Sequence, residues 1–349
     1  MDLKELTFAL CSLMSVSGHE STCEGELFEL IGKHFDEYRT DAVGNHLFIK
    51  RSAKKGATSV LIDAHYDEIG MLVTDVREGG FLGVCQVGGL DPAILQASEV
   101  RIYGKETLTG VIASTPPHLK KSADENLKKV DELIIDTGYG KEELEELVRV
   151  GTPVGFAPIY REIGKNTDQI AGKAFDDKSC AAAAVYGIAL AKREELASDV
   201  YLLLSCHEET VKDGGVAPAA FSLMPDYAMV IDVNFARVPG ADTPETIEMG
   251  KGFSITSSAV TDRKLTNLTF ELCREKEIKH QRCASPNSTG TNATTLNLVG
   301  RGVPVVDIGL PLKNMHTATE VLSLADSEEL ARLVKEFVCS EKIAEVYAQ

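Results

Sequence analysis

Residues 171–209 read AGKAFDDKSCAAAAVYGIALAKREELASDVYLLLSCHEE, and this stretch decides the fold. From Ser179 to Lys192 the chain is rich in alanine and other apolar residues, which predicts a buried helix. Val200 to Ser205 is a short apolar run, which is typical of a buried strand. A helix that leads into a buried strand is the repeating unit of parallel sheets, so the stretch indicates an α/β protein.

The same alternation continues on both sides of this stretch. Two amphipathic helices are expected within roughly the first 35 residues. Further strands are predicted at 59–64, 227–231, 253–256 and 303–308, and further helices at 262–276, 290–298 and 325–339. Together they predict an α/β fold whose mixed, largely parallel sheet carries helices on both faces.

The segment 70–166 has a different texture, with short β patterns separated by glycines, as in Phe81-Leu82-Gly83-Val84. We expect it to form a small β-rich domain inserted into the α/β domain. The α/β domain would then consist of residues 1–69 and 167–349. A chain of 349 residues is long enough for two such domains.

Charge and cysteine content restrict the partners and the compartment. With 36 basic and 53 acidic residues the net charge is −17, which argues against nucleic acid and anionic membranes as partners. No run of 18 apolar residues occurs, and the acidic start Met1-Asp2-Leu3-Lys4-Glu5 does not resemble a signal peptide. None of the eight cysteines forms a Cys-x-x-Cys pair, which predicts free thiols in a cytoplasmic protein.

Acidic residues and histidines follow several of the predicted strands or precede the apolar helix. Each one alone is more often a helix cap or a solvent-facing side chain. As a set they offer two imidazoles and three carboxylates, the ligands that zinc and similar metals accept. These are enough for two ions about 3.5–4 Å apart that share a bridging carboxylate and a water. The candidate ligands are His65, Asp176, Glu209, Asp232 and His316.

The adjacent pair Glu208-Glu209 directly follows an apolar strand. Adjacent carboxylates repel each other unless a cation holds at least one of them, although a solvated acidic loop is the simpler alternative. In a metal site one glutamate would bind an ion, and the other would take a proton from the attacking water and pass it to the leaving amine. Asp67, two residues beyond His65, is expected to orient that imidazole by accepting its free N–H.

Taken together, these motifs resemble a known family, the tetrahedral aminopeptidases, which include glutamyl, leucyl and deblocking enzymes and some proteins labelled endoglucanase. The resemblance runs from Ser17-Gly18-His19-Glu20 to the final helix. The motifs that carry it are His65-Tyr66-Asp67-Glu68-Ile69-Gly70, Gly172-Lys173-Ala174-Phe175-Asp176-Asp177, His207-Glu208-Glu209, Val230-Ile231-Asp232-Val233 and Met315-His316-Thr317.

This resemblance implies a zinc-peptidase-like catalytic domain in a metallo-aminopeptidase that removes N-terminal residues from peptides. It implies two divalent ions per subunit, with zinc expected and cobalt or manganese as alternatives. Asp176 would bridge the ions, which His65, Glu209, Asp232 and His316 would also bind. Glu208 would be the general base and Asp67 would support His65. The inserted domain would aid assembly into a homo-oligomer, a hollow dodecamer in many members.

The chain departs from the family pattern at four positions, Lys178, Cys180, Lys212 and Asn292, none of which is a predicted ligand. These departures leave two alternatives open. One is a di-metal deacylase or amidase that acts on N-acylated or non-peptide substrates. The other is a non-catalytic relative that binds metal without turnover. A requirement for a free α-amine would favour the aminopeptidase over both.

Overall fold

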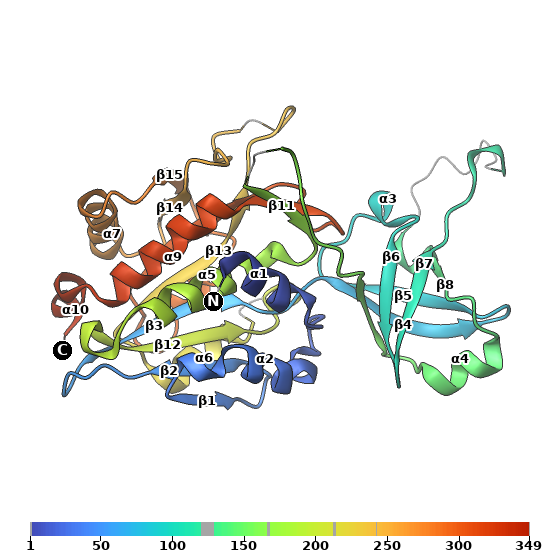
Figure 1. Cartoon of the computed structure of the whole chain (residues 1–349), viewed down its shortest axis with the longest axis horizontal. Helices are drawn as coiled ribbons and strands as arrows, with labels where there is room; N and C mark the ends of the chain where they lie inside the picture. Colours follow the sequence, from blue (N-terminus) through green and yellow to red (C-terminus); the bar gives the residue numbers. More distant parts are fainter. Residues whose placement is uncertain (1, 120–128, 166–167, 212–213, 242, 349) are drawn as a thin grey trace.

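The computed structural model describes residues 2–119, 129–165, 168–211, 214–241 and 243–348. These residues form a large mixed sheet of eight strands, a closed barrel and a small three-stranded sheet. Figure 1 shows the barrel beside the large sheet and its helices. The predicted α/β fold with a separate small β-rich unit is thus confirmed.

The centre of the large sheet is parallel, from β12 through β3 and β13 to β16. The edges are mixed, because β2 pairs antiparallel with β12 and β14 pairs antiparallel with β16. Two edge strands, β1 and β15, were not expected from the sequence; both are polar and partly exposed. In sheet order the strands are β1 (Glu37–Thr40), β2 (His46–Lys50), β12 (Ser198–Ser205), β3 (Thr58–His65), β13 (Tyr227–Phe235), β16 (Val305–Leu312), β14 (Phe253–Ser258) and β15 (His280–Ser285).

Helices cover both faces of this sheet, and each face has its own apolar core. The alanine-rich α5 (Phe175–Leu190) is the central helix of the larger core, where it packs between the sheet and α9 (Leu324–Val338). Its many alanines allow the close approach of both neighbours. The same core includes α1 (Leu3–Ser12), α2 (Glu24–Ile31), α7 (Arg263–Glu275) and α10 (Glu341–Tyr347), and the opposite core includes α6 (Val216–Leu223) and α8 (Ala293–Leu296).

The barrel closes through pairing of its first strand, β4, with its last, β9, and encloses a separate apolar core. All six strands lie within the predicted inserted segment 70–166, whose boundaries and assembly role stay a prediction. In barrel order the strands are β4 (Gly70–Arg77), β5 (Phe81–Val87), β8 (Ile134–Asp136), β7 (Thr107–Ile112), β6 (Glu99–Tyr103) and β9 (Pro153–Phe156), with α3 (Pro92–Leu95) and α4 (Lys141–Leu147) outside them.

After the barrel the chain returns through a small sheet of β10 (Arg161–Glu162), β11 (Gln169–Gly172) and β17 (Glu320–Ser323). Next to it, Glu68 forms buried ion pairs with Lys173 at 2.5 Å and with Lys178 at 3.3 Å. These pairs tie the segment after β3 to the start of α5. Within the described residues, no helix is long and apolar enough to cross a membrane.

Candidate active site

Three adjacent parallel strands bring most of the candidate residues to one level of the sheet. His65, the last residue of β3, pairs with Ser205 at the end of β12, and the Glu208-Glu209 loop follows directly. On the other side, the register that pairs Asp63 with Val230 places Asp232 level with His65. Asp232 does not end its strand as the sequence suggested, because β13 continues to Phe235 alongside β16.

The remaining two candidates come from segments that a buried glutamate holds together. Asp176 lies at the start of α5, where the backbone of Asp176 and Asp177 departs from helical geometry. His316 lies in the loop between β16 and β17. The Glu320 carboxylate accepts hydrogen bonds from the backbone N–H groups of Phe175 at 2.7 Å, Asp176 at 3.2 Å and His316 at 3.0 Å. Glu320 thereby fixes both segments, a role that sequence reasoning missed although it lies only four residues after His316.

The two oxygens of the Asp176 carboxylate face two different histidines. Oδ1 lies 2.9 Å from His65 Nε2, and Oδ2 lies 3.3 Å from His316 Nε2. Asp232 Oδ1 is 3.8 Å from the same nitrogen of His65, and Glu209 Oε1 is 3.3 Å from that of His316. The five residues therefore form two His–carboxylate pairs that share Asp176 in the middle.

This donor set fits divalent metal ions. Ligand atoms of His65, Asp176 and Glu209 lie within 4.8 Å of one another, and so do those of His65, Asp177 and Asp232. Burial, followed by repulsion from Asp177, raises the pKa of Asp232 well above its usual range. A divalent cation would remove this repulsion, since it binds carboxylates in their charged form. Asp177 was not among the expected ligands; only its place beside Asp176 in the sequence could have indicated it.

Glu208 has a different environment from the five residues above. Burial raises its pKa to about 7, with His65 lowering it and Glu209 raising it. The described residues contain three combinations of potential metal ligands, the third being Glu20 with Cys206 and His207, and none of them includes Glu208. Glu208 is a partly buried carboxylate that is not part of any of these potential metal sites, and such a group is suited to proton transfer.

Asp67 supports the site by two routes. Its backbone carbonyl lies 3.0 Å from His65 Nδ1, whereas its carboxylate oxygen is 3.6 Å from that nitrogen. The carboxylate accepts instead from the backbone N–H groups of Glu208 at 3.0 Å and Glu209 at 3.1 Å. The backbone carbonyl of Asp67 thus makes the contact with the His65 imidazole, and its carboxylate fixes the glutamate loop.

The barrel also reaches the site. The backbone carbonyl of Gly89, in the loop after β5, lies 3.0 Å from His316 Nδ1. This contact leaves His316 Nε2 free to face Asp176 and Glu209. A backbone carbonyl has no signature in a sequence, so this contact could not be predicted.

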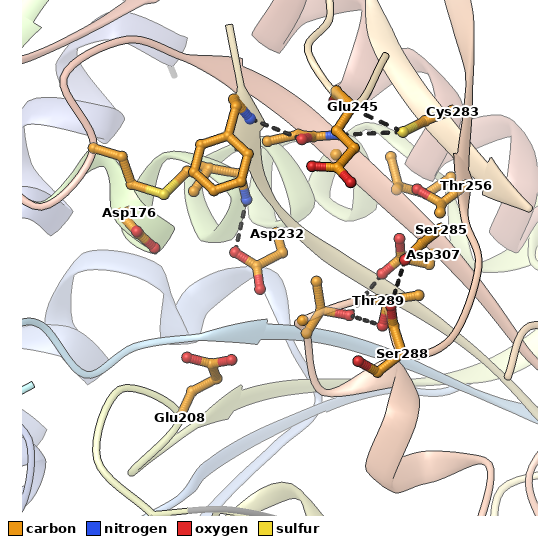
Figure 2. A pocket seen from close by; sticks show the side chains of 18 of the residues that line it. Asp176, Glu208, Asp232, Glu245, Thr256, Cys283, Ser285, Ser288, Thr289 and Asp307 are labelled. Atoms are coloured by element: carbon orange, nitrogen blue, oxygen red, sulfur yellow. Dashed lines mark hydrogen bonds between the residues drawn. The ribbon is translucent and has the colours of Figure 1, made fainter. Parts of the chain in front are cut away.

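The five candidate ligands and Glu208 line one side of a cavity of about 460 Å³. Figure 2 shows Asp176, Glu208 and Asp232 on one side of it, and Ser288, Thr289 and Asp307 on the other. Three of the four departures from the family pattern lie outside the described lining, because Lys178 and Cys180 are buried and Asn292 bonds to Asp63 and Ser205. The fourth, Lys212, lies outside the described residues.

Comparisons with known proteins give one consistent result. A model of the family described as M42 glutamyl aminopeptidase matches residues 44–333. The chain is 30% identical over 339 residues to a lysyl aminopeptidase of Pyrococcus furiosus, with 95% of each protein covered. It resembles an aminopeptidase structure from Desulfurococcus kamchatkensis with a TM-score of 0.89 and 29% identity, covering 99% of this chain and 96% of that one. The TET1 peptidase of Pyrococcus horikoshii, described as assembling into a tetrahedron or an octahedral shell, gives a TM-score of 0.83 at 27% identity, with 97% and 99% covered.

Proposed function

The chain belongs to the M42 glutamyl aminopeptidase family, and we propose that its cavity removes N-terminal residues from peptides with two bound metal ions and a general base, Glu208. The observation that carries this proposal is the Asp176 carboxylate, whose two oxygens face the imidazoles of His65 and His316. His65, Asp232 and Asp176 would bind one ion, and His316, Glu209 and Asp176 the other. Zinc is the expected metal, with cobalt and manganese as alternatives for the same ligands.

Two ions in these positions would supply Lewis acidity to polarise the scissile carbonyl, a docking point for the free amine and a lower pKa for the attacking water. The chain's own residues do the rest. Glu208 takes a proton from the water and returns it to the leaving amine. Asp67 holds the backbone of the Glu208-Glu209 loop, and Glu320 holds that of Asp176 and His316. The carboxylates and imidazoles thus keep a fixed geometry before the substrate arrives.

We further propose that the chain forms a homo-oligomer, with the dodecamer as the expected form, in the cytoplasm. The oligomer is supported by two similar structures, one described as a dodecamer and the other as assembling into a tetrahedron or a large octahedral shell. The compartment is supported by the eight cysteines, all of which are free thiols. Light scattering after size exclusion measures the assembly directly, and a monomeric mass would contradict it.

The function is tested by hydrolysis of free and N-acetylated aminoacyl-p-nitroanilides before and after metal removal. We expect chelation to abolish turnover, and zinc, cobalt or manganese to restore it, because the ions would polarise the scissile carbonyl and lower the pKa of the attacking water. Turnover should be confined to substrates with a free α-amine. Equal turnover of N-acetylated substrates would favour the deacylase alternative, and tight binding of two ions without any turnover would favour a non-catalytic relative.

A substitution in the barrel loop is expected to weaken metal binding. A Cβ atom at Gly89 would lie 2.9 Å from His316 Nδ1, so Gly89→Ala must displace the imidazole or the loop. Loss of such outer contacts typically weakens binding by about 10- to 100-fold. Calorimetric titration of metal-free protein with zinc measures this change. The control is Gly140→Ala in the same barrel, where nothing lies within 4 Å of the added atom. Wild-type affinity in Gly89→Ala would show that this contact does not position His316.

A further inference from the structure

The cavity has a second wall that the proposed mechanism does not use. It is formed by β14, by β15 and the loop after it, and by Asp307 of β16. In Figure 2 this wall faces Asp176, Glu208 and Asp232 across the open space. A substrate whose scissile bond lies at the metal-ligand cluster would direct its N-terminal side chain toward this wall. Ala284 and Gly290 also contribute to this wall, and its other lining residues carry polar or thiol side chains: Asp307, Thr256, Cys283, Ser285, Ser288, Thr289 and Thr291.

Asp307 is a carboxylate without a basic partner among the cavity's described lining residues. It is only 4% exposed, and it accepts a hydrogen bond from the Thr291 hydroxyl at 2.7 Å and another from Thr256. Two neutral donors leave part of its acceptor capacity unused. Burial raises the pKa of Asp307 to about 6, although the two hydrogen bonds from Thr291 and Thr256 lower it. The described residues that line the cavity include no lysine or arginine.

A second carboxylate, that of Glu245, lies over the same space. Glu245 is exposed, and its segment contacts the second wall where its backbone carbonyl meets Cys283 Sγ at 4.0 Å. Figure 2 shows its side chain directed into the space between Asp232 and Thr256. In addition to the metal-ligand cluster and Glu208, the cavity therefore has one buried carboxylate, Asp307, and one exposed carboxylate, Glu245.

We infer that this wall binds the side chain of a basic N-terminal residue, lysine or arginine, through Asp307 and Glu245. The inference rests on the proposed function, because it assumes that the substrate's N-terminal residue enters this cavity. A cationic side chain would give Asp307 the partner it lacks, and an acidic side chain would be repelled by both carboxylates. A neutral side chain would leave Asp307 with only its two hydrogen bonds from threonine hydroxyls to offset its burial.

The depth of the wall also favours a long side chain. Asp232 pairs with Gly309, and Asp307 lies two residues before Gly309 on the neighbouring strand. With a rise of about 3.3 Å per residue and a strand spacing of about 4.8 Å, the Cα atoms of Asp232 and Asp307 are roughly 8 Å apart. A substrate held near Asp232 must bridge such a distance to reach Asp307. Lysine and arginine carry their charge at the end of a long stem, which suits this spacing.

The test compares kcat/KM for lysyl, arginyl, leucyl and glutamyl p-nitroanilides with metal-loaded protein. The basic substrates should exceed leucyl by at least about 10-fold, as expected for a hydrogen bond between charged groups, and glutamyl should be poorest. Asp307→Asn should lower kcat/KM for lysyl by about 10- to 100-fold and change leucyl by less than about threefold. Glu245→Gln, at an exposed position that does not endanger folding, should lower lysyl by about two- to fivefold.

Glu248→Gln is the matched control, because Glu248 lies three residues beyond Glu245, pairs with Arg237 at 3.3 Å and is absent from the described lining. It should leave all four substrates unchanged. A wild-type preference for leucyl or glutamyl, or an equal loss on every substrate in both variants, would overturn the inference. Complete absence of turnover with metal supplied would instead refute the proposed function. Calorimetry with lysinamide and leucinamide gives a readout independent of turnover, in which Asp307→Asn should weaken only lysinamide.

Discussion

Replacing Glu208 with glutamine is expected to lower kcat by about 10²- to 10⁴-fold, the usual contribution of a general acid–base residue. The substitution keeps the size of the side chain and removes its ability to accept a proton from water. The proposed carboxylate ligands Asp176, Asp232 and Glu209 face the imidazoles of His65 or His316, and none of the three combinations of potential ligands among the described residues includes Glu208. Two ions per subunit should therefore stay bound. Steady-state kinetics and elemental analysis of the same preparation measure both quantities.

The control for this variant is Glu271→Gln, which removes an exposed carboxylate that pairs with Lys342 on the far helices α7 and α10. It should leave kcat unchanged. Near-normal activity of Glu208→Gln would refute the role of Glu208 as the base. Loss of one ion together with activity would instead make Glu208 a ligand, and the assignment within the Glu208-Glu209 pair would then have to be reversed.

The fold was predictable where apolar periodicity is strong. The alanine-rich helix α5 and the strands β3, β12 and β13 are buried almost throughout. Their sequences therefore contain apolar runs, from which each element could be predicted. The edge strands β1 and β15 are half exposed and polar, and their pairing depends on neighbours distant in the chain. Closure of the barrel between β4 and β9 is likewise set by non-local pairing, which local patterns do not encode.

The candidate site was predictable as a set of residue types, less so as a set of contacts. His65 could be placed because it ends an apolar strand, whereas Asp232 lies inside its strand, since β16 continues to pair with β13 beyond it. The contacts of Glu320 and Gly89 involve backbone groups, and backbone groups look the same in every sequence. Asp307 escaped notice because an aspartate within an apolar run carries no motif; only the cavity reveals its position.

Asp176→Ala is expected to abolish turnover and to release both ions, whereas Asp232→Asn and Glu209→Gln should each weaken mainly one. The reason is geometric, because the two oxygens of Asp176 face His65 and His316 separately. If about four ligands share a binding free energy of roughly 10–16 kcal/mol, losing one costs about two to three powers of ten in affinity. Because Asp176 would serve both ions, its removal should impose that loss twice. Equilibrium dialysis against a fixed concentration of free zinc, followed by elemental analysis, measures the number of ions that stay bound.

The comparison among the three variants separates a shared ligand from a merely essential one. Asp176→Ala should retain no ion at a zinc concentration where Asp232→Asn and Glu209→Gln each retain about one of the two expected for a shared-ligand site. All three would lose activity, so turnover alone could not distinguish them, and the metal count carries the argument. Retention of one ion in Asp176→Ala would mean that Asp176 serves a single site. Asp177, which lies within 4.8 Å of His65 and Asp232 in the structure, would then be the carboxylate that completes the other.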